Sequence, residues 1–332
     1  PTGKSTAAGT KEDPLDFETA VNFCQAGQTV YALDGTYTFK STIEIPHGNS
    51  GTASQMKKLY AYSGNDGVVF DFSGTSSTFN VSGDYWHVKG INVTKGGGLR
   101  VGGNHNIIEL CKTYNNSETG LQISRTDSAK TIDAWPAYNT VLNCDSYNNR
   151  DSSDNNADGF AAKLTVGEGN VFQGCIAYNN VDDGWDLFAK ASLIGAVKVI
   201  DCIAYGNGFC VNDDGELVTT KGDGNGFKLG GSGQPVAHEI RNSISFGNKA
   251  NGFTNNSDPV FNAYDCIGYN NGGENIELHI YTNASTDKLV VDGFYSFADD
   301  HIGDMALLNG KNTGTDLSNS TVKNGNFKSE KN

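Results

Sequence analysis

The chain of 332 residues carries 42 glycines and 37 asparagines but only 6 prolines, a composition that excludes collagen-like and proline-rich disordered polypeptides. A hydrophobic share of 37% is enough to bury a core, so a folded protein is expected. The formal net charge of −14 argues against nucleic acid as a partner, because phosphate binding needs a basic surface, and no apolar run approaches the roughly 20 residues of a membrane span.

The first predicted element is an amphipathic capping helix at about residues 14–27. Its apolar side chains recur at the spacing of one helix face: Phe17, Ala20, Val21 and Cys24. The helix would run from Asp16 to Ala26 and end at Gly27, before a strand-like run at 29–33. A solenoid needs its open end covered, so we expect this helix to cap the repeats that follow it.

Much of the remaining chain repeats a six-residue phrase, first seen as Cys111-Lys-Thr-Tyr-Asn-Asn116. Further copies begin at residues 144, 175, 202, 243 and 266, and the shortest spacing is 23 residues. Short β-rich segments with Gly and Asn at matching places are typical of a solenoid in which each repeat is one rung. The sequence therefore predicts an all-β, right-handed parallel β-helix in one domain spanning residues 1–332, with an irregular polar tail at about 312–332.

Stacked rungs place equivalent residues in columns about 4.8 Å apart. The last asparagine of each phrase should then form a hydrogen-bonded ladder: Asn116, Asn149, Asn180, Asn207, Asn248 and Asn271. Asparagine and glycine also tolerate the left-handed backbone that sharp turns require. The cysteine and Tyr/Phe columns are interpreted as packing ladders, and nothing in the sequence requires a disulfide.

A second phrase concentrates acidic residues. Its four copies read Asp158-Gly-Phe160, Asp183-Gly-Trp185, Asn225-Gly-Phe227 and Asn251-Gly-Phe253. Aligning the glycines stacks Asp158 on Asp183, with Asp182 and Asp186 in the same rung. Like charges about 4 Å apart repel by roughly 1 to 4 kcal/mol, depending on the local dielectric. The group is therefore either splayed into water or held together by a cation, and its oxygen ligands suit Ca²⁺.

Two lysines belong to the same outward face by strand alternation. Lys228 falls in the column of Asp186 one rung further on, and Lys163 falls one rung back and two residues along. From spacing alone, each lysine is most simply a salt-bridge partner of the acidic group.

Three segments, at 156–170, 182–188 and 225–231, together resemble polysaccharide lyase family nine, whose members are parallel β-helix enzymes typified by pectate lyases. The resemblance implies a catalytic Ca²⁺ held by four aspartates: Asp158, Asp182, Asp183 and Asp186. It also implies a lysine base at Lys228, with Lys221 a lesser candidate because the stretch 208–224 varies in length. The implied reaction is calcium-assisted β-elimination in pectate or polygalacturonate, although some members of the family cleave rhamnogalacturonan.

The partner implied by this resemblance is an acidic plant cell-wall polysaccharide, handled by a secreted and monomeric protein. The chain opens without a signal peptide, which we interpret as a mature or trimmed terminus. Several basic residues are candidates for further substrate carboxylates, although each is equally well a solvated charge: Arg100, Arg125, Lys163, Lys190 and Arg241.

Two alternatives to a family-nine lyase stay open from the sequence. A β-helical polygalacturonase would use paired aspartates, which Asp182 and Asp183 fit loosely, but the Gly-His-Gly and Arg-Ile-Lys segments of such enzymes do not occur. A non-catalytic β-helical protein would bind polysaccharide without shortening it.

Overall fold

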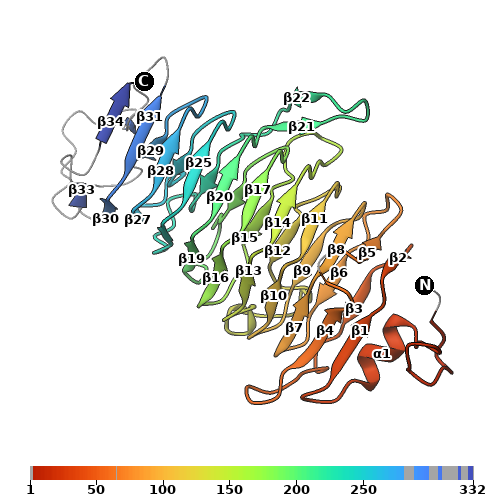
Figure 1. Ribbon diagram of the computed structural model, residues 1–332. Helices are drawn as coiled ribbons and strands as arrows, with labels where there is room; N and C mark the ends of the chain where they lie inside the picture. The colour runs from red at the N-terminus through yellow and green to blue at the C-terminus, as the bar shows by residue number, and fades with distance from the viewer. Residues whose placement is uncertain are drawn as a thin grey trace.

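The structure is a computed structural model that describes residues 3–64, 66–279, 288–298, 306–308, 321–322 and 328–331. Within these residues the chain winds as a right-handed parallel β-helix, whose successive rungs give strands to three parallel sheets (Figure 1). The sheets, here called A, B and C, hold eleven, eleven and ten described strands. The predicted fold class is confirmed.

Sheet A contains β1 (Thr29–Ala32), β4 (Lys57–Ala61), β7 (Trp86–Lys89), β10 (Ile107–Glu109), β13 (Thr140–Leu142), β16 (Asn170–Gln173), β19 (Val197–Ile200), β24 (Glu239–Arg241), β27 (Val260–Tyr264), β30 (Lys288–Asp292) and β33 (Thr321–Val322). Sheet B contains β2 (Gly35–Thr38), β5 (Val68–Asp71), β8 (Ile91–Thr94), β11 (Lys112–Tyr114), β14 (Asp145–Tyr147), β17 (Ile176–Tyr178), β20 (Ile203–Tyr205), β25 (Ile244–Phe246), β28 (Ile267–Tyr269), β31 (Tyr295–Ala298) and β34 (Lys328–Lys331). Sheet C contains β3 (Ile43–Ile45), β6 (Phe79–Val81), β9 (Leu99–Val101), β12 (Leu121–Ile123), β15 (Phe160–Ala162), β18 (Trp185–Asp186), β23 (Phe227–Lys228), β26 (Phe253–Thr254), β29 (Ile276–His279) and β32 (Ala306–Leu308).

Helix α1 (Phe17–Phe23) covers the N-terminal end of the solenoid (Figure 1). Its Val21 is fully buried, and the ring of Phe17 packs edge-on against Phe70 and Phe79 at centroid distances of 5.6 and 5.8 Å. The predicted capping role of this helix is confirmed by these contacts.

The helix is shorter than the predicted segment 14–27. It begins as expected, because the Asp16 side chain accepts a hydrogen bond from the Thr19 N–H at 2.8 Å. It ends at Phe23, however, and Cys24 has an extended backbone. The carbonyl of Val21 accepts a hydrogen bond from the Asn49 side chain at 2.9 Å, so a tertiary contact takes the acceptor that another helical turn would use.

The predicted irregular tail at 312–332 lies mostly outside the described residues. Two short strands within it are described, and β33 pairs with β30 while β34 pairs with β31, both in parallel. The expectation of irregular structure is wrong for these two segments, because their backbones continue sheets A and B.

The asparagine ladder forms as predicted. From Asn116 to Asn271, each side-chain NH2 group donates to the side-chain oxygen of the ladder asparagine in the next rung, at 2.8–3.0 Å. The residue before each ladder asparagine has a positive φ, as at Asn148 (51°) and Asn179 (55°), which explains why Asn or Gly occupies that place. The ladder therefore fixes the turn that leads from sheet B to sheet C.

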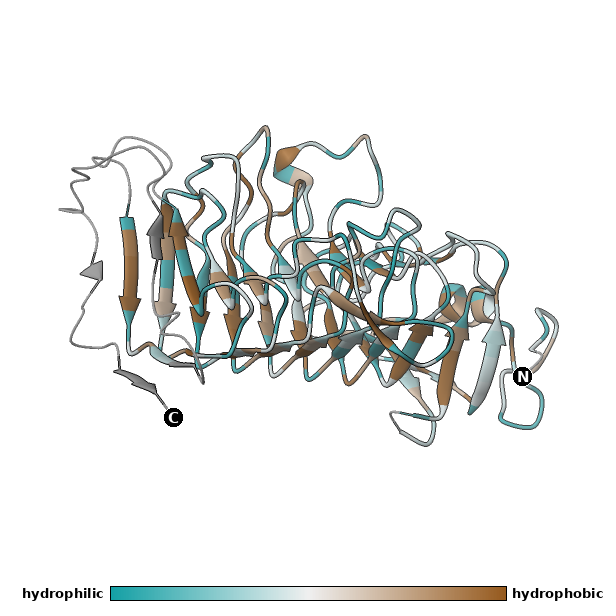
Figure 2. Cartoon of the chain, turned by 90° about the horizontal axis from the view of Figure 1, so that it is seen from above, coloured by the Kyte–Doolittle hydropathy of each residue, from teal (hydrophilic) through white to brown (hydrophobic). Residues whose placement is uncertain are grey.

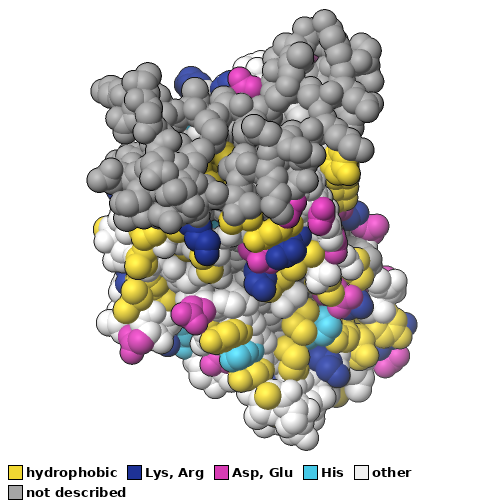
Figure 3. All heavy atoms as spheres, turned by 90° about the vertical axis from the view of Figure 1, so that its left-hand side faces the viewer, with side chains coloured by type: hydrophobic (Ala, Val, Ile, Leu, Met, Phe, Trp, Pro, Cys, Tyr) yellow, Lys and Arg dark blue, Asp and Glu magenta, His cyan; other side chains and the backbone are white. Residues whose placement is uncertain are grey.

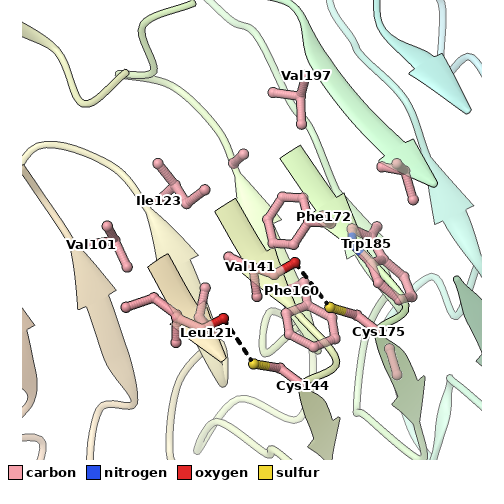
Figure 4. Packing of buried hydrophobic residues seen from close by; sticks show 14 of the residues in the cluster. Val101, Leu121, Ile123, Val141, Cys144, Phe160, Phe172, Cys175, Trp185 and Val197 are labelled. Carbon is pink, nitrogen blue, oxygen red and sulfur yellow. Dashed lines mark hydrogen bonds between the residues drawn. The ribbon is translucent and has the colours of Figure 1, made fainter. Parts of the chain in front are cut away.

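Side chains that point into the solenoid form a continuous apolar core. Phe160, Phe172 and Trp185 pack together in the middle of it (Figure 4). The seven cysteines are buried free thiols, and that of Cys175 donates to the Val141 carbonyl at 3.4 Å (Figure 4). Apolar residues are concentrated in the strands, whereas the connecting loops are mostly polar (Figure 2).

Loops project from the chain on both sides of sheet C, and a site can form between them. One set enters sheet C from sheet B and includes the hairpin β21 (Phe209–Val211) and β22 (Leu217–Thr219). The other set leaves sheet C for sheet A and includes a short 3-10 helix, η1 (Ile132–Ala134). Across the described residues, no helix has the length and apolar character needed to traverse a bilayer.

Candidate active site

Three adjacent strands of sheet C form the floor of the site. In β15, β18 and β23 the inward residues Phe160, Trp185 and Phe227 stack at centroid distances of 4.8 and 4.7 Å. The parallel register then places Ala161, Asp186 and Lys228 in one outward column. Strand alternation thus brings Asp186 and Lys228 to the same face, as the sequence predicted.

The turns that precede β15 and β18 contribute three further carboxylates. Asp158 and Asp183 are fully buried and Asp182 is 7% exposed. One oxygen from each of the three lies within 4.8 Å of the others. A side chain at Gly159, which follows Asp158, would place its Cβ 2.7 Å from the Asn180 amide, so glycine lets this acidic turn lie directly against the asparagine ladder.

Each of these carboxylates is held by hydrogen bonds. Asp158 accepts from the Thr119 hydroxyl at 3.0 Å, and Asp182 accepts from the Asp223 N–H at 2.6 Å. Asp183 accepts from the N–H and the side-chain amide of Asn225 at 2.8 and 2.9 Å. The acidic group is therefore positioned by neighbouring rungs and not splayed into solvent.

Two lysines lie against this group. The Lys163 ammonium is 2.6 Å from Asp158 Oδ2 and 2.7 Å from Asp186 Oδ2. The Lys228 ammonium is 3.0 Å from Asp183 Oδ2 and 3.4 Å from Asp223 Oδ2. Lys163 therefore bridges Asp186 and one of the three clustered carboxylates, Asp158.

The buried charges do not balance. When all four carboxylates are ionised, the two ammonium groups leave two negative charges, which a divalent cation would neutralise. Burial, opposed by Lys163 but reinforced by Asp186 and Asp183, raises the pKa of Asp158 to about 7. Burial together with the charges of Asp183 and Asp158 raises the pKa of Asp182 to about 9.

The other charged groups respond to the same imbalance. Burial also raises the pKa of Asp183, against the opposing effect of Lys228. At Asp186, burial is outweighed by Lys163 and Lys228, which hold its pKa below the ordinary value. Burial disfavours both ammonium groups, but the surrounding aspartates raise the pKa of Lys163 and of Lys228 above that of a free lysine.

The donor set fits calcium. Two oxygens on opposite sides of an ion bound at about 2.4 Å lie at most about 4.8 Å apart, which is the separation that the three clustered carboxylates satisfy. The second oxygen of Asp186, Oδ1, is buried without a hydrogen-bond partner among the described residues. A buried carboxylate oxygen without a donor is costly, and a cation would supply the missing interaction.

A pocket of about 300 Å³ opens over this group. Its lining includes both lysines, the carboxylates of Asp182 and Asp186, the ring of Phe188 and the exposed side chain of Lys190. The pocket therefore combines oxygen ligands, two amines and an aromatic surface in one cavity.

The profile of the Pel9A-like, right-handed β-helix region matches residues 1–287. The chain belongs to polysaccharide lyase family nine. A relative named pectate lyase L from Thermoclostridium stercorarium is 48% identical over 303 residues, which cover 90% of this chain but only 24% of that protein. This family-nine chain thus spans about a quarter of the length of that relative.

Two solved structures resemble this family-nine chain over nearly its whole length. The crystal structure of pectate lyase Pel9A has a TM-score of 0.74 and 30% identity, covering 97% of this chain and 77% of that chain. A rhamnogalacturonan lyase has the same TM-score of 0.74 and 26% identity, covering 98% of this chain and 86% of that chain.

The remaining basic residues predicted for the site are dispersed in this member of family nine. Arg125 lies in the loop after β12, where its guanidinium donates to the Lys130 carbonyl at 2.9 Å. Arg100 lies in β9 in the outward column of sheet C, two rungs before Ala161, and donates to the Gln122 side chain.

Arg241 is not part of the pocket. It lies in β24 on sheet A, 2.7 Å from Glu239 and stacked over the ring of Tyr264 at 4.0 Å. Its predicted contact with substrate stays a prediction, and that contact would lie outside this pocket. Lys221 is exposed on the loop after β22 and forms no ion pair with the described residues, and its N–H donates to the Asp154 carbonyl at 3.0 Å.

Sequence reasoning missed two residues that shape the site. Asn225 holds Asp183, and its place in the second repeated phrase, aligned with Asp158 and Asp183, was a usable signal. Asp223 contacts Lys228 and donates its N–H to Asp182, but it lies in the loop between β22 and β23, where no periodicity points to it.

Proposed function

We propose that this chain is a pectate lyase that cleaves an acidic, uronate-containing polysaccharide by β-elimination. The observation that carries the proposal is the gathering of Asp158, Asp182, Asp183 and Lys228 around one pocket on sheet C. Membership of family nine supports the same substrate class, as does the similarity to a relative and a solved structure that are both named pectate lyases.

Ca²⁺ is the proposed cofactor, held by Asp158, Asp182, Asp183 and Asp186. Bound calcium would neutralise the carboxylate of the uronate and favour the enolate-like transition state. The protein's part is to hold these carboxylates in place through Thr119 and Asn225, which keeps the ligands oriented.

Lys228 is the proposed base. Its amine would take the proton from the carbon next to the uronate carboxylate, while the glycosidic C–O bond at the neighbouring carbon breaks and a carbon–carbon double bond forms. Only the neutral amine accepts a proton, and the aspartates raise the pKa of Lys228, so activity should increase toward alkaline pH.

Lys163 and Lys190 line the pocket and are the proposed contacts for further substrate carboxylates. Arg125 is a more distant candidate, since its guanidinium is engaged by a backbone carbonyl. A cell-wall polymer as substrate would place the protein outside the cell, and a monomer would suffice because the described pocket is built from one chain.

A rhamnogalacturonan lyase is the second candidate, because a structure of that name matches the fold at 26% identity. The two candidates share the elimination chemistry and differ in the polymer. A non-catalytic carbohydrate-binding protein would leave the polymer intact.

One assay separates these functions. The double bond formed by elimination absorbs in the near ultraviolet, so absorbance is followed on polygalacturonate, methylated pectin and rhamnogalacturonan, with and without a chelator. We expect absorbance to rise on polygalacturonate and expect this rise to stop when calcium is removed. A rise on rhamnogalacturonan alone supports the second candidate, and no rise on any polymer contradicts the lyase proposal.

A further inference from the structure

Lys163 has an unusual position for a substrate-binding residue. It follows β15, and its side chain, which is 17% exposed, turns back so that the ammonium lies between carboxylates from two adjacent rungs. The distances of 2.6 Å to Asp158 and 2.7 Å to Asp186 are those of charge-assisted hydrogen bonds. The ammonium therefore occupies a space between two of the proposed calcium ligands.

This ammonium does not satisfy the group. When ionised, the four buried carboxylates carry two negative charges more than Lys163 and Lys228 neutralise. Among the described residues, Asp186 Oδ1 has no hydrogen-bond partner even with Lys163 in place on Oδ2. Lys163 thus provides one positive charge at a place where the oxygen ligands and the excess of two negative charges match a divalent ion.

We propose that Lys163 is a tethered counter-ion of the calcium site, which occupies the Asp158–Asp186 pair until calcium enters and displaces its ammonium toward the pocket. The proposal rests on the calcium site of the proposed function. An ammonium and a divalent cation held by the same two carboxylates repel each other, so both cannot keep their full contacts.

The proposal gives Lys163 two states. Without the metal, the ammonium relieves the repulsion between Asp158 and Asp186. With the metal, the amine is released on a flexible side chain beside Lys190, in the same pocket. The released ammonium then lies where a uronate carboxylate of the substrate would enter, so that calcium binding prepares the pocket for an acidic saccharide.

The first consequence concerns calcium affinity in the absence of substrate. Because calcium must displace the ammonium, Lys163 lowers the affinity, and Lys163→Met should bind calcium about tenfold more tightly, which is a typical size for coupling between two ligands. A residue that merely supports the carboxylates would have the opposite effect, since its loss would loosen the ligands and weaken calcium binding.

Titration calorimetry with calcium chloride, at one fixed pH, measures whether Lys163→Met raises or lowers the calcium affinity. Lys163→Met is compared with wild type, with the charge-conserving Lys163→Arg and with Lys190→Met, which removes a lysine from the same pocket but not from the aspartates. We expect tighter binding for Lys163→Met alone. Unchanged or weaker binding by Lys163→Met overturns the inference.

A second measurement needs no variant and applies if Lys163→Met does not fold. An amine-acetylating reagent is applied to the wild-type chain with and without saturating calcium, and the labelled peptides are quantified by mass spectrometry. We expect calcium to increase the labelling of Lys163 several-fold relative to Lys198, an exposed lysine in β19 on sheet A. Labelling that stays constant or falls overturns the inference.

The two proposals fail in different ways. A wild-type chain that binds no calcium overturns both this inference and the calcium site. Calcium binding that Lys163→Met weakens overturns only the inference, and a polymer assay without elimination overturns the lyase activity while leaving the displacement measurements valid.

Discussion

Lys228 lies directly opposite Asp186 in the parallel register of sheet C, yet its ammonium contacts Asp183, which belongs to the turn before β18, at 3.0 Å. The column therefore brings the amine to the correct face, and the buried charge of the turn decides where it points. This arrangement places the proposed base beside the three clustered carboxylates, Asp158, Asp182 and Asp183.

Lys228→Ala should abolish most of the turnover. General-base catalysis contributes typically about 10²–10⁴-fold, so a loss of at least about a hundredfold in kcat is expected. The side chain lies outside the apolar core, so the fold and the stabilisation by calcium should persist. Initial rates from the ultraviolet assay and a thermal shift with calcium measure both quantities.

Lys221→Ala is the matched control for the base, because Lys221 is exposed on the loop before Lys228. It should keep close to wild-type turnover. Substantial activity in Lys228→Ala, together with its loss in Lys221→Ala, would show that the base is misassigned.

Asp183→Asn should remove the thermal stabilisation that calcium provides. A ligand at 100 times its Kd stabilises the native state by about 2.7 kcal/mol, which is visible as a higher Tm. The amide keeps an oxygen that can accept from Asn225 but loses the charge, so the metal-free variant should still fold. Asp127→Asn, which changes an exposed loop carboxylate, should retain the full calcium shift. An equal shift in both variants would exclude Asp183 as a ligand.

Asp258 should make stability depend on pH between weakly acidic and mildly alkaline conditions. Burial raises its pKa from 3.8 to about 8, although the Val260 and Val236 N–H groups partly oppose this. The folded protein thus holds this proton more tightly than the unfolded chain does. Its stabilising contribution is complete below the unfolded pKa and is lost as pH rises through the folded value.

Asp258→Asn cannot titrate and should therefore lose less stability over that pH range than wild type. One pKa unit corresponds to about 1.4 kcal/mol, so the shift sets an upper bound of several kcal/mol on the difference. Urea denaturation at a series of pH values gives the free energy of unfolding for both proteins. Parallel pH profiles for the two would contradict the prediction.

Asn180→Ala should destabilise the solenoid, because Asn180 lies in the middle of the ladder. Its amide donates to Asn207 at 3.0 Å and to the Ser146 carbonyl at 3.1 Å, and its oxygen accepts from Asn149 at 2.9 Å. Each buried polar group left without a partner costs about 1–3 kcal/mol, so a loss of at least about 2 kcal/mol is expected.

Chemical denaturation measures the effect of Asn180→Ala, and Asn22→Ala is its control. Asn22 is exposed in α1, where substitution should change the free energy of unfolding by less than about 0.5 kcal/mol. A similar small change for Asn180→Ala would mean that the ladder contributes little to stability.

The boundaries of the fold show where sequence reasoning stops. The start of α1 follows from the Asp16 side chain and was predictable, whereas its end depends on Asn49, which reaches Val21 from another part of the chain. In the same way, the strands β33 and β34 carry no repeated phrase, and only pairing with the preceding rung makes them part of sheets A and B.

The sequence by itself determined the register of the solenoid and, with it, the faces of Asp186 and Lys228. A repeated turn leaves each strand only one alignment with its neighbour, and strand alternation then assigns every side chain to a face. Only the tertiary structure decided which charges meet. A lysine side chain is long enough to reach several carboxylates near its rung, so Lys163 bridges Asp158 and Asp186 according to burial and charge and not according to spacing. Likewise, the loop that brings Asp223 to Lys228 lies outside the stacked strands, so no repeat predicts its course.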